Sequence, residues 1–342
     1  MAYRVPAGAD QWFVVYRLLA GATLGVFALA CGATTASDCY EKVVAVRWVE
    51  HTWGTVPINA VWVGVADGSI LVRSAREDGS TAGLDQPGRF GVVPVTSDHL
   101  VGIAGVPATD ELTVITREAT TFVSTLGGGL WDEGPRIPTS FALRALTASE
   151  SGDRWAVGAG GYIARLIGAE WTGEQYTADD LEGVWASDDS VWTVGGASVL
   201  RRSGDASFED AGLVAAGLHG VFGLPTGEVF VVGDGGGWFR WDGAEWSQIV
   251  TPTESALRCV WADPELGAWA GGDDGALLHL APGATEASAE KPPSSEFNLA
   301  ITAIYGSRTT GVGYAPTELA LWVGTAEGSA LSKEAVVSTI CE

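Results

Sequence analysis

The histidines are the side chains best suited to acid–base or metal chemistry near neutral pH, and they are scattered along the chain. His51, His99, His219 and His279 share no position in the repeat described below, and none stands in an HxH or HExxH arrangement. The sequence also contains no GxSxG nucleophile elbow and no P-loop. We therefore assign no catalytic residue, no metal site and no cofactor from motifs.

Acidic residues recur in turns and are the next candidates. Asp67, Asp274 and Glu327 each precede the glycine of a matched turn, and Asp234 lies close to another such turn. Matched turns of a repeat protein lie on one face, which makes these four acids candidate rim residues. No Asp-x-Asp-x-Asp calcium loop accompanies them. No two acids can be paired from the sequence at the separation that a glycosidase requires.

The four cysteines have no CxxC metal-ligand spacing. Cys259 stands in the apolar segment Leu257–Trp261 and is expected to be a small buried hydrophobe. Cys39 and Cys341 lie near the two ends of the chain that follows residue 30. A closed ring would bring those ends together, and an exported protein can form disulfides, so these two are a candidate bridge. Such a bridge would contribute about 4–5 kcal/mol.

The N-terminal segment has the features of an export signal. Leu18–Ala30 is thirteen uncharged residues after Arg17, which suits a signal-peptide core and is too short to span a membrane. Ala28-Leu29-Ala30-Cys31-Gly32 resembles a bacterial lipobox, although Ala28 and Leu29 depart from the usual residues. The resemblance implies a signal peptide over 1–30, lipidation of Cys31, and a tether and lead-in over 31–42. The location implied is the outer membrane or periplasm. Ordinary cleavage after Ala30, giving a soluble secreted protein, is the alternative.

A repeated phrase, an aromatic residue followed within two positions by Val-Gly or Ala-Gly, sets the architecture. Its aromatic anchors are Trp62, Trp155, Trp192, Phe230, Trp269 and Trp322. The four central anchors recur at intervals of 37, 38 and 39 residues, and the last interval lengthens to 53. The interval of 93 residues after Trp62 has room for a degenerate unit at Leu100. The spacing therefore predicts seven units.

Each unit contains the signals for four strands. An apolar segment precedes the anchor strand, a glycine follows six residues after most anchors, and an apolar third strand comes next. A polar stretch then leads to a fourth strand, which we expect to end in tryptophan in two units, at Trp171 and Trp246. Four such strands in about 38 residues predict an all-β propeller of seven four-stranded antiparallel blades over 43–341. Helical solenoids are disfavoured, because no helical apolar spacing persists.

Two segments carry a family resemblance. Arg154–Ile163, with Trp171 closing the unit, and Gly236–Trp246 are similar to bacterial Trp/Gly propeller repeats. Those repeats occur in photosystem II assembly factor-like proteins and in exported lipoproteins. The resemblance implies the fold and export, and it leaves the function open because the repeat is a widespread scaffold.

The charge limits the partners. The formal net charge is −23, which disfavours nucleic acid and anionic headgroups, so membrane attachment is expected through the lipid anchor alone. We expect a non-enzymatic platform that binds a protein or glycan through the loops of one face. The candidate contact segments are Arg117–Ser140, Ala284–Phe297 and Thr309–Thr317. A polysaccharide hydrolase or lyase acting at the channel mouth is the alternative, and the oligomeric state stays open.

Overall fold

The computed structural model describes the backbone of residues 3–7, 9–13, 17–19, 43–53, 56–65, 68–75, 91–106, 111–125, 131–290, 300–308, 318–325 and 330–336. Side chains are described for 68, 70, 95–105, 111–124, 131–290 and 300–306. In this part of the chain the regular structure is almost entirely β-strand, and the only helical segments are three-residue 3₁₀ turns.

Five four-stranded antiparallel sheets follow one another between Leu100 and Ala289, each with its strands in sequence order. The first two sheets contain β8 (Leu100–Val106), β9 (Glu111–Thr116), β10 (Thr121–Thr125), β11 (Asp132–Glu133), and β12 (Leu143–Ala148), β13 (Arg154–Gly158), β14 (Tyr162–Ile167), β15 (Glu170–Gln175). The next two contain β16 (Gly183–Ala186), β17 (Ser190–Gly195), β18 (Ser198–Ser203), β19 (Glu209–Asp210), and β20 (Leu218–Gly223), β21 (Val229–Gly233), β22 (Trp238–Trp241), β23 (Trp246–Gln248). The fifth contains β24 (Leu257–Asp263), β25 (Gly267–Gly272), β26 (Leu277–Leu280) and β27 (Ser288–Ala289).

Strands from both ends of the chain complete the ring. One sheet contains β4 (Val43–Trp53), β5 (Val56–Val65), β6 (Ser69–Ala75) and β7 (Gly91–Pro94). Another contains β28 (Ile301–Arg308), β29 (Glu318–Thr325) and β30 (Ala330–Val336), and β3 (Arg17–Leu19) pairs in parallel with β30. A separate hairpin joins β1 (Tyr3–Ala7) to β2 (Ala9–Phe13).

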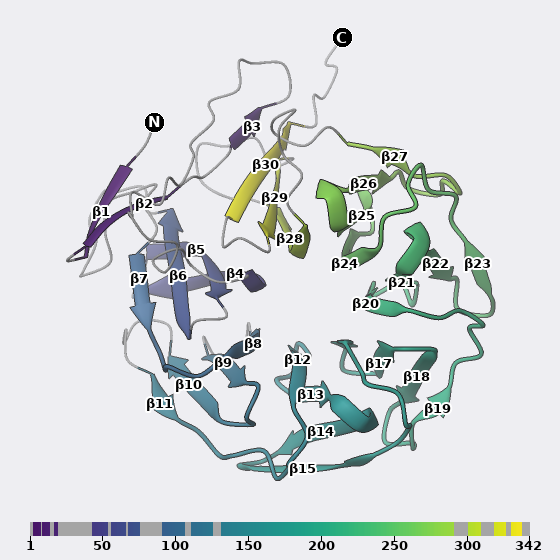
Figure 1. Ribbon diagram of the computed structural model, residues 1–342, viewed down its shortest axis with the longest axis horizontal. Helices are drawn as coiled ribbons and strands as arrows, with labels where there is room; N and C mark the ends of the chain where they lie inside the picture. The colour runs from purple at the N-terminus through teal and green to yellow at the C-terminus, as the bar shows by residue number, and fades with distance from the viewer. Residues whose placement is uncertain are drawn as a thin grey trace.

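The first strand of each sheet faces the centre of the ring (Figure 1). Each of these inner strands contacts the next, from β4 through β8, β12, β16, β20 and β24 to β28, and β28 contacts β4 again. This arrangement is a β-propeller of four-stranded antiparallel blades, as the repeat predicts. The count of seven blades stays a prediction, because most of the sheets at the two ends of the chain are described by backbone alone.

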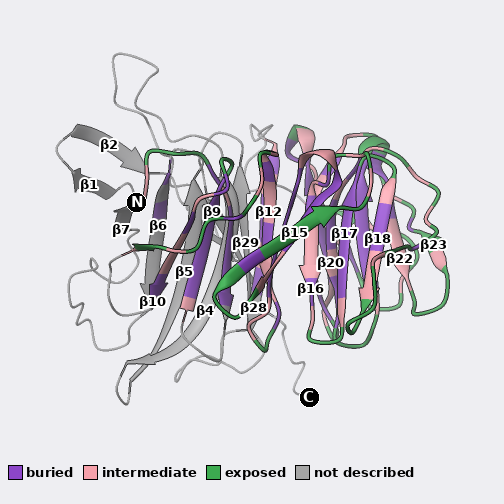
Figure 2. Ribbon diagram, turned by 90° about the horizontal axis from the view of Figure 1, so that it is seen from below, coloured by how far each residue is buried: buried purple, intermediate pink, exposed green. Residues whose placement is uncertain are grey.

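In the five blades between Leu100 and Ala289, burial falls from the second strand to the fourth (Figure 2). Every residue of β13 and β21 is buried, whereas both residues of β19 and of β27 are exposed. A second strand packs against neighbouring blades on both faces, which explains why the anchor strands are continuously apolar. The core is therefore divided into clusters between blades, such as the one that joins Trp192 of β17 to Val221 and Val231 of the next blade.

The turns after the anchor strands β13, β21 and β25 share one geometry. Two consecutive residues have positive φ, at 63° and 68° in Gly160-Gly161 and at 57° and 69° in Asp274-Gly275, as a type I′ turn requires. A Cβ on the second residue would also meet a backbone carbonyl, at 2.1 Å from Thr177 O for Gly161. Glycine is thus needed there for both conformation and space, and the Asp-Gly hairpin predicted at Asp274 is confirmed.

Three expectations from the repeat need correction. Leu100 begins β8, an inner strand, so the anchor strand of that blade is β9, which has lost both the tryptophan and the glycine. Trp171 and Trp246 lie at the beginning of β15 and β23, not at the end. Arg117–Ser140 is not an inserted contact loop, because it includes β10 and β11.

The remaining N-terminal predictions are not decided by these strands. Cleavage after residue 30 would remove β1 to β3, and the pairing of β3 with β30 would then be absent from the processed chain. The signal peptide and the tether over 31–42 stay predictions. Within the described residues, no helix has the length and apolar character needed to cross a membrane.

Candidate functional site

Four aromatic side chains form an arc around the centre of the ring. Trp185, Phe222, Trp261 and Tyr305 lie on the inner strands β16, β20, β24 and β28, each opposite the anchor aromatic of its own blade. Successive ring centroids are 6.3, 6.2 and 6.3 Å apart, in tilted arrangements. The spacing lies within the range of favourable aromatic pairs. We name these four residues the aromatic arc.

The neighbouring blades are shaped to accept the arc. Ideal Cβ atoms on Gly223 and Gly306 would lie 2.5 Å from the ring of Trp185 and 2.3 Å from the ring of Trp261. Each of these glycines directly follows an arc residue of the next blade. The two indoles therefore lie against backbone, and a larger residue at either glycine would displace them.

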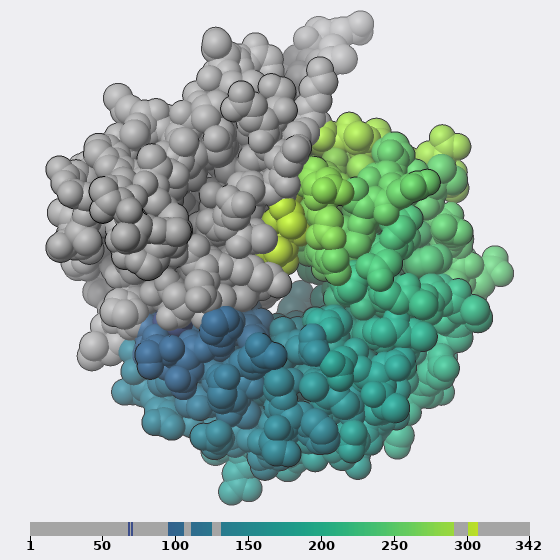
Figure 3. Space-filling model, in the orientation of Figure 1, coloured from purple at the N-terminus to yellow at the C-terminus, as the bar shows by residue number. Residues whose placement is uncertain are grey.

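A cavity of about 740 Å³ opens where the turns between first and second strands meet the inner strands. Trp185, Phe222 and Tyr305 are half-buried and line it, whereas Trp261 is buried behind them. Figure 3 shows the ring hollowed at its centre. Volumes of 300–1,000 Å³ are typical of ligand sites. The cavity is therefore the best candidate functional site in the described part of the chain.

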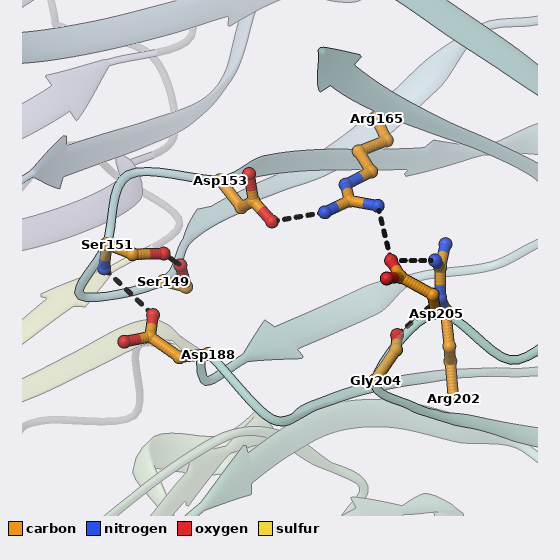
Figure 4. Close-up of polar contacts among 8 residues, drawn as sticks. All are labelled: Ser149, Ser151, Asp153, Arg165, Asp188, Arg202, Gly204 and Asp205. Atoms are coloured by element: carbon orange, nitrogen blue, oxygen red, sulfur yellow. Dashed lines mark hydrogen bonds and ion pairs between the residues drawn. The ribbon is translucent and has the colours of Figure 1, made fainter.

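Polar groups at the mouth of this cavity come from the turns of adjacent blades. The Ser151 amide donates to Asp188 Oδ1 at 2.8 Å, and the hydroxyls of Ser149 and Ser151 lie 3.0 Å apart (Figure 4). The hydrogen bond from the Ser151 amide, with help from the two hydroxyls, holds the pKa of Asp188 below its usual value. Asp188 is therefore a carboxylate at neutral pH, and its position is fixed by the preceding blade.

The opposite end of the channel is charged. The inner strands β12, β20 and β24 each have a β-bulge there, and Arg144, His219 and Arg258 occupy the bulged positions. Arg144 pairs with Asp180 at 2.5 Å and with Glu182 at 2.7 Å on the next blade. A β-bulge turns one extra side chain out of the ladder, which explains why these residues face their neighbours across the blade interface.

Arg258 and His219 extend the same network between two further blades. Arg258 pairs with Asp273 at 2.6 Å, and this hydrogen bond, opposed in part by burial, raises the pKa of its guanidinium. His219 Nε2 lies 2.8 Å from both Asp234 Oδ1 and Arg258 Nη1. A ring nitrogen either donates or accepts, so only one of these two contacts is satisfied at a time. The network therefore ties neighbouring blades together.

A smaller cavity of about 320 Å³ lies between the β12–β15 and β16–β19 blades. The guanidinium groups of Arg165 and Arg202 lie 5.1 and 5.0 Å from the centroid of Trp155. Arg165 also pairs with Asp153 at 2.5 Å, and Asp205 lies 3.5 Å from Arg165 and 3.3 Å from Arg202 (Figure 4). The carboxylates of Asp153 and Asp205 neutralise the two arginines. This cluster therefore connects adjacent blades and is a poor anion site.

The candidate residues from the sequence fall in several places. Asp234 contacts His219, and Asp274 accepts a hydrogen bond from Ser255 Oγ at 2.8 Å, so the two described rim acids have separate partners. No group of acids, histidines or cysteines within the described residues is arranged to hold a metal ion. Five candidates lie outside the described residues, and nothing tests their predicted roles: Cys31, Cys39, Asp67, Glu327 and Cys341.

The structure also shows where Cys259, His279 and part of the candidate contact segments lie. The thiol of Cys259 donates to the Gly271 carbonyl at 3.6 Å, and the residue is half-buried at the edge of the large cavity, not fully buried as expected. His279 stacks on Trp269 with centroids 4.4 Å apart. The first half of Ala284–Phe297 includes β27, and its second half and Thr309–Thr317 lie outside the described residues.

Sequence reasoning did not find the aromatic arc. In the sequence, the four residues are only the last residues of the apolar segments that precede the anchors. Each of them pairs with the anchor aromatic of its own blade. This shared position could have identified them, but only if the innermost strand of a blade had been known.

No protein-family model matches the chain, and no curated protein matches it. Solved structures do. YCF48 bound to D1 peptide is 14% identical with a TM-score of 0.63, covering 86% of this chain and 94% of that one. Virginiamycin B lyase from Staphylococcus aureus with Quinupristin, in a catalytically inactive form, is 13% identical with a TM-score of 0.63, covering 86% and 95%. The WD40 β-propeller domain of Doa1 is 10% identical with a TM-score of 0.64, covering 85% and 92%.

At these identities the likeness shows the fold alone. It supports the propeller repeat and, because YCF48 is a photosystem II assembly factor, the resemblance to that group at the level of architecture. The same fold carries a peptide-bound protein and a lyase, so the neighbours do not choose between binding and catalysis for this chain.

Proposed function

We propose that this protein is a non-enzymatic binding scaffold whose large cavity holds a segment of a partner protein. The observation that carries the proposal is the aromatic arc. Half-buried aromatic rings leave apolar area to be covered, and aromatic residues dominate the energetics of protein interfaces. The arc stands on inner strands and lies against glycine backbone, so it is organised before any partner binds.

The surroundings suit an extended protein segment. The mouth is built from several turns whose polar groups alternate with apolar residues such as Leu224, Pro225 and Pro264. A cavity of about 740 Å³ is large enough for a few side chains and too small for a folded domain. A propeller neighbour is described as bound to a peptide, which supports this type of occupant.

The carboxyl groups give little support to the alternative of a polysaccharide hydrolase or lyase. A general acid needs a raised pKa, whereas the pKa values of Asp180, Asp188 and Asp242 are lowered by hydrogen bonds from backbone amides. At the charged end of the channel, acids and arginines pair with one another across blades. Binding is therefore the function that the geometry supports best.

The cellular setting belongs to the same proposal. Lipidation of Cys31 would place the ring close to a membrane of the cell envelope, and cleavage without lipidation would release it. Metabolic labelling with a radioactive fatty acid separates the two: the label enters the wild-type chain and not Cys31→Ser. Absence of label from the wild type would favour the secreted form.

Peptide-library selection against the full chain tests the binding site. Binding by selected peptides should weaken at least tenfold in Phe222→Leu and Tyr305→Leu, as for aromatic anchors. Tyr176→Leu is the matched control, because Tyr176 lies in the smaller outer cavity. Equal binding by the arc variants and the wild type would refute the site. Binding to a glycan panel in place of peptides would replace a protein partner by a glycan.

A further inference from the structure

The described part of the large cavity's rim carries charge of one sign. Glu150, Asp188 and Asp189 are exposed and line its mouth, and no lysine, arginine or histidine is among the lining residues whose side chains the structure describes. These acids come from two adjacent turns, the one after β12 and the one after β16. The charged network at the other end of the channel differs, because there Asp180, Asp234 and Asp273 each lie close to an arginine or histidine.

Asp188 is a carboxylate whose position is fixed by a backbone hydrogen bond. Its Oδ1 accepts the hydrogen bond from the Ser151 amide, which lowers the pKa of the carboxyl group without adding a cation. The carboxylate therefore keeps its full negative charge near the mouth. Asp189 lies beside it in the chain, and its described hydrogen bond is made by the backbone carbonyl, to the amide of Gly204.

The walls below the acids have the same electrostatic preference. The face of an aromatic ring carries partial negative charge and attracts a lysine ammonium or an arginine guanidinium within about 6 Å. Trp185, Phe222 and Tyr305 present three such rings beneath the acidic rim. Carboxylates above and aromatic faces below both favour a cation that carries apolar parts.

We propose that the cavity recognises a basic protein segment, in which an arginine or lysine enters among the arc residues while Asp188 and Asp189 face the neighbouring positive charges. This inference rests on the proposed function and specifies the chemistry of the partner. The net charge of −23 also draws basic segments toward the protein and repels acidic ones.

Two synthetic peptides test the inference on the full chain kept in detergent. One has the sequence GLRLRLG with blocked ends, and the other has citrulline, a neutral isostere, in place of both arginines. Fluorescence anisotropy should show about tenfold tighter binding of the arginine peptide at 50 mM salt. Raising the salt to 500 mM should weaken binding of the arginine peptide and leave the citrulline peptide nearly unchanged.

Variants assign the effect to the cavity. Asp188→Asn and Asp189→Asn should each weaken the arginine peptide about threefold, and the double variant more, without changing the citrulline peptide. Glu170→Gln is the control, because it removes the same charge from an exposed residue of β15 that does not line the cavity. Thermal unfolding of every variant reports whether the ring is intact.

The outcomes separate this inference from the proposed function. Equal affinity for the two peptides, or unchanged affinity in the acid variants, would overturn the inference that the segment is basic. The occupant would then be a neutral segment. Binding of neither peptide up to 1 mM would also overturn it. The proposed function itself fails if Phe222→Leu and Tyr305→Leu leave the binding of library-selected peptides unchanged.

Discussion

The indole of Trp185 lies against Gly223 of the next blade, so close that an ideal Cβ on the glycine would be 2.5 Å from the ring. Trp261 and Gly306 repeat this relationship two blades further along, at 2.3 Å. The aromatic arc is thus fixed by pairs of residues from different blades, and its geometry depends on the order in which the blades pack.

Gly223→Ala should lower the free energy of unfolding by about 1–3 kcal/mol, because the methyl group must push Trp185 from its place. The measurement is urea unfolding followed by circular dichroism. The same substitution in a Trp185→Leu background should cost less, since the smaller side chain leaves room for the methyl group. If the double variant lost as much stability as the two single variants together, the two residues would not interact.

Trp238 and Trp246 should respond differently to phenylalanine. Trp238 is fully buried, and its indole N–H has no hydrogen-bond partner among the described residues, whereas Trp246 donates to the Ala211 carbonyl at 2.9 Å across the blade interface. Trp246→Phe loses that bond, worth about 1 kcal/mol. Trp238→Phe removes an unsatisfied donor and leaves a small void.

Calorimetry at neutral pH measures the stability of both variants. For each unit of buried side-chain volume removed, Trp238→Phe should therefore lose less unfolding free energy than Trp246→Phe. Trp238→Ala, in contrast, should cost about 3–5 kcal/mol. A Trp246→Phe variant as stable as the wild type would contradict the role given to the hydrogen bond.

The stabilisation provided by Asp180 should depend on pH. The hydrogen bond from the Gly160 amide and the nearby Arg144 lower the pKa of Asp180 below its usual value in the folded protein. A lowered folded-state pKa gives stability that is fully present above the unfolded-state pKa and is lost as the pH falls through the folded-state value. The melting temperatures of wild type and Asp180→Asn should differ at pH 6 and converge toward pH 2.5.

Exposed Glu170→Gln serves as the control, with a nearly constant difference over the same range. A difference between wild type and Asp180→Asn that persists unchanged at pH 2.5 would contradict the assignment. Because Asp180 is half exposed, the effect should be modest and should shrink in high salt.

Asp274 should tolerate glycine and asparagine far better than valine. Its φ of 57° is the conformation that Gly160 and Gly235 adopt at the matching positions. Asp274→Gly relieves backbone strain but loses the bond to Ser255, so unfolding stability should change by less than about 0.5 kcal/mol. Asp274→Val should cost about 1–3 kcal/mol, because a β-branched residue is strained there. Chemical denaturation measures the unfolding free energy of both variants. An Asp274→Val variant as stable as the wild type would show that the backbone at this position is not strained.

The repeat could be read from the sequence because each blade must solve the same local problems. An anchor strand buried on both faces needs a continuous apolar run, and the type I′ turn that follows needs Asp-Gly or Gly-Gly. These requirements recur at matched positions, as at Gly161 and Gly275. The prediction failed at Leu100 for the same reason: β9 meets its packing needs without tryptophan or glycine, so the pattern pointed to the preceding strand.

The candidate site was less predictable than the fold. Acids such as Asp234 and Asp274 drew attention because they recur in turns, yet their carboxylates contact His219 and Ser255. Tyr305 and Phe222 carry no motif. They become neighbours of Trp261 only because consecutive inner strands meet around one channel.

The sequence alone therefore determined the four-stranded unit, its turns and its apolar anchor strands, since these depend on residues close together in the chain. Only the tertiary structure decided which strand lies innermost, which aromatic rings meet and where the acids gather at a cavity mouth. Those relationships join residues about 40 positions apart in different blades, and they are fixed by packing between sheets, which leaves no local pattern in the sequence.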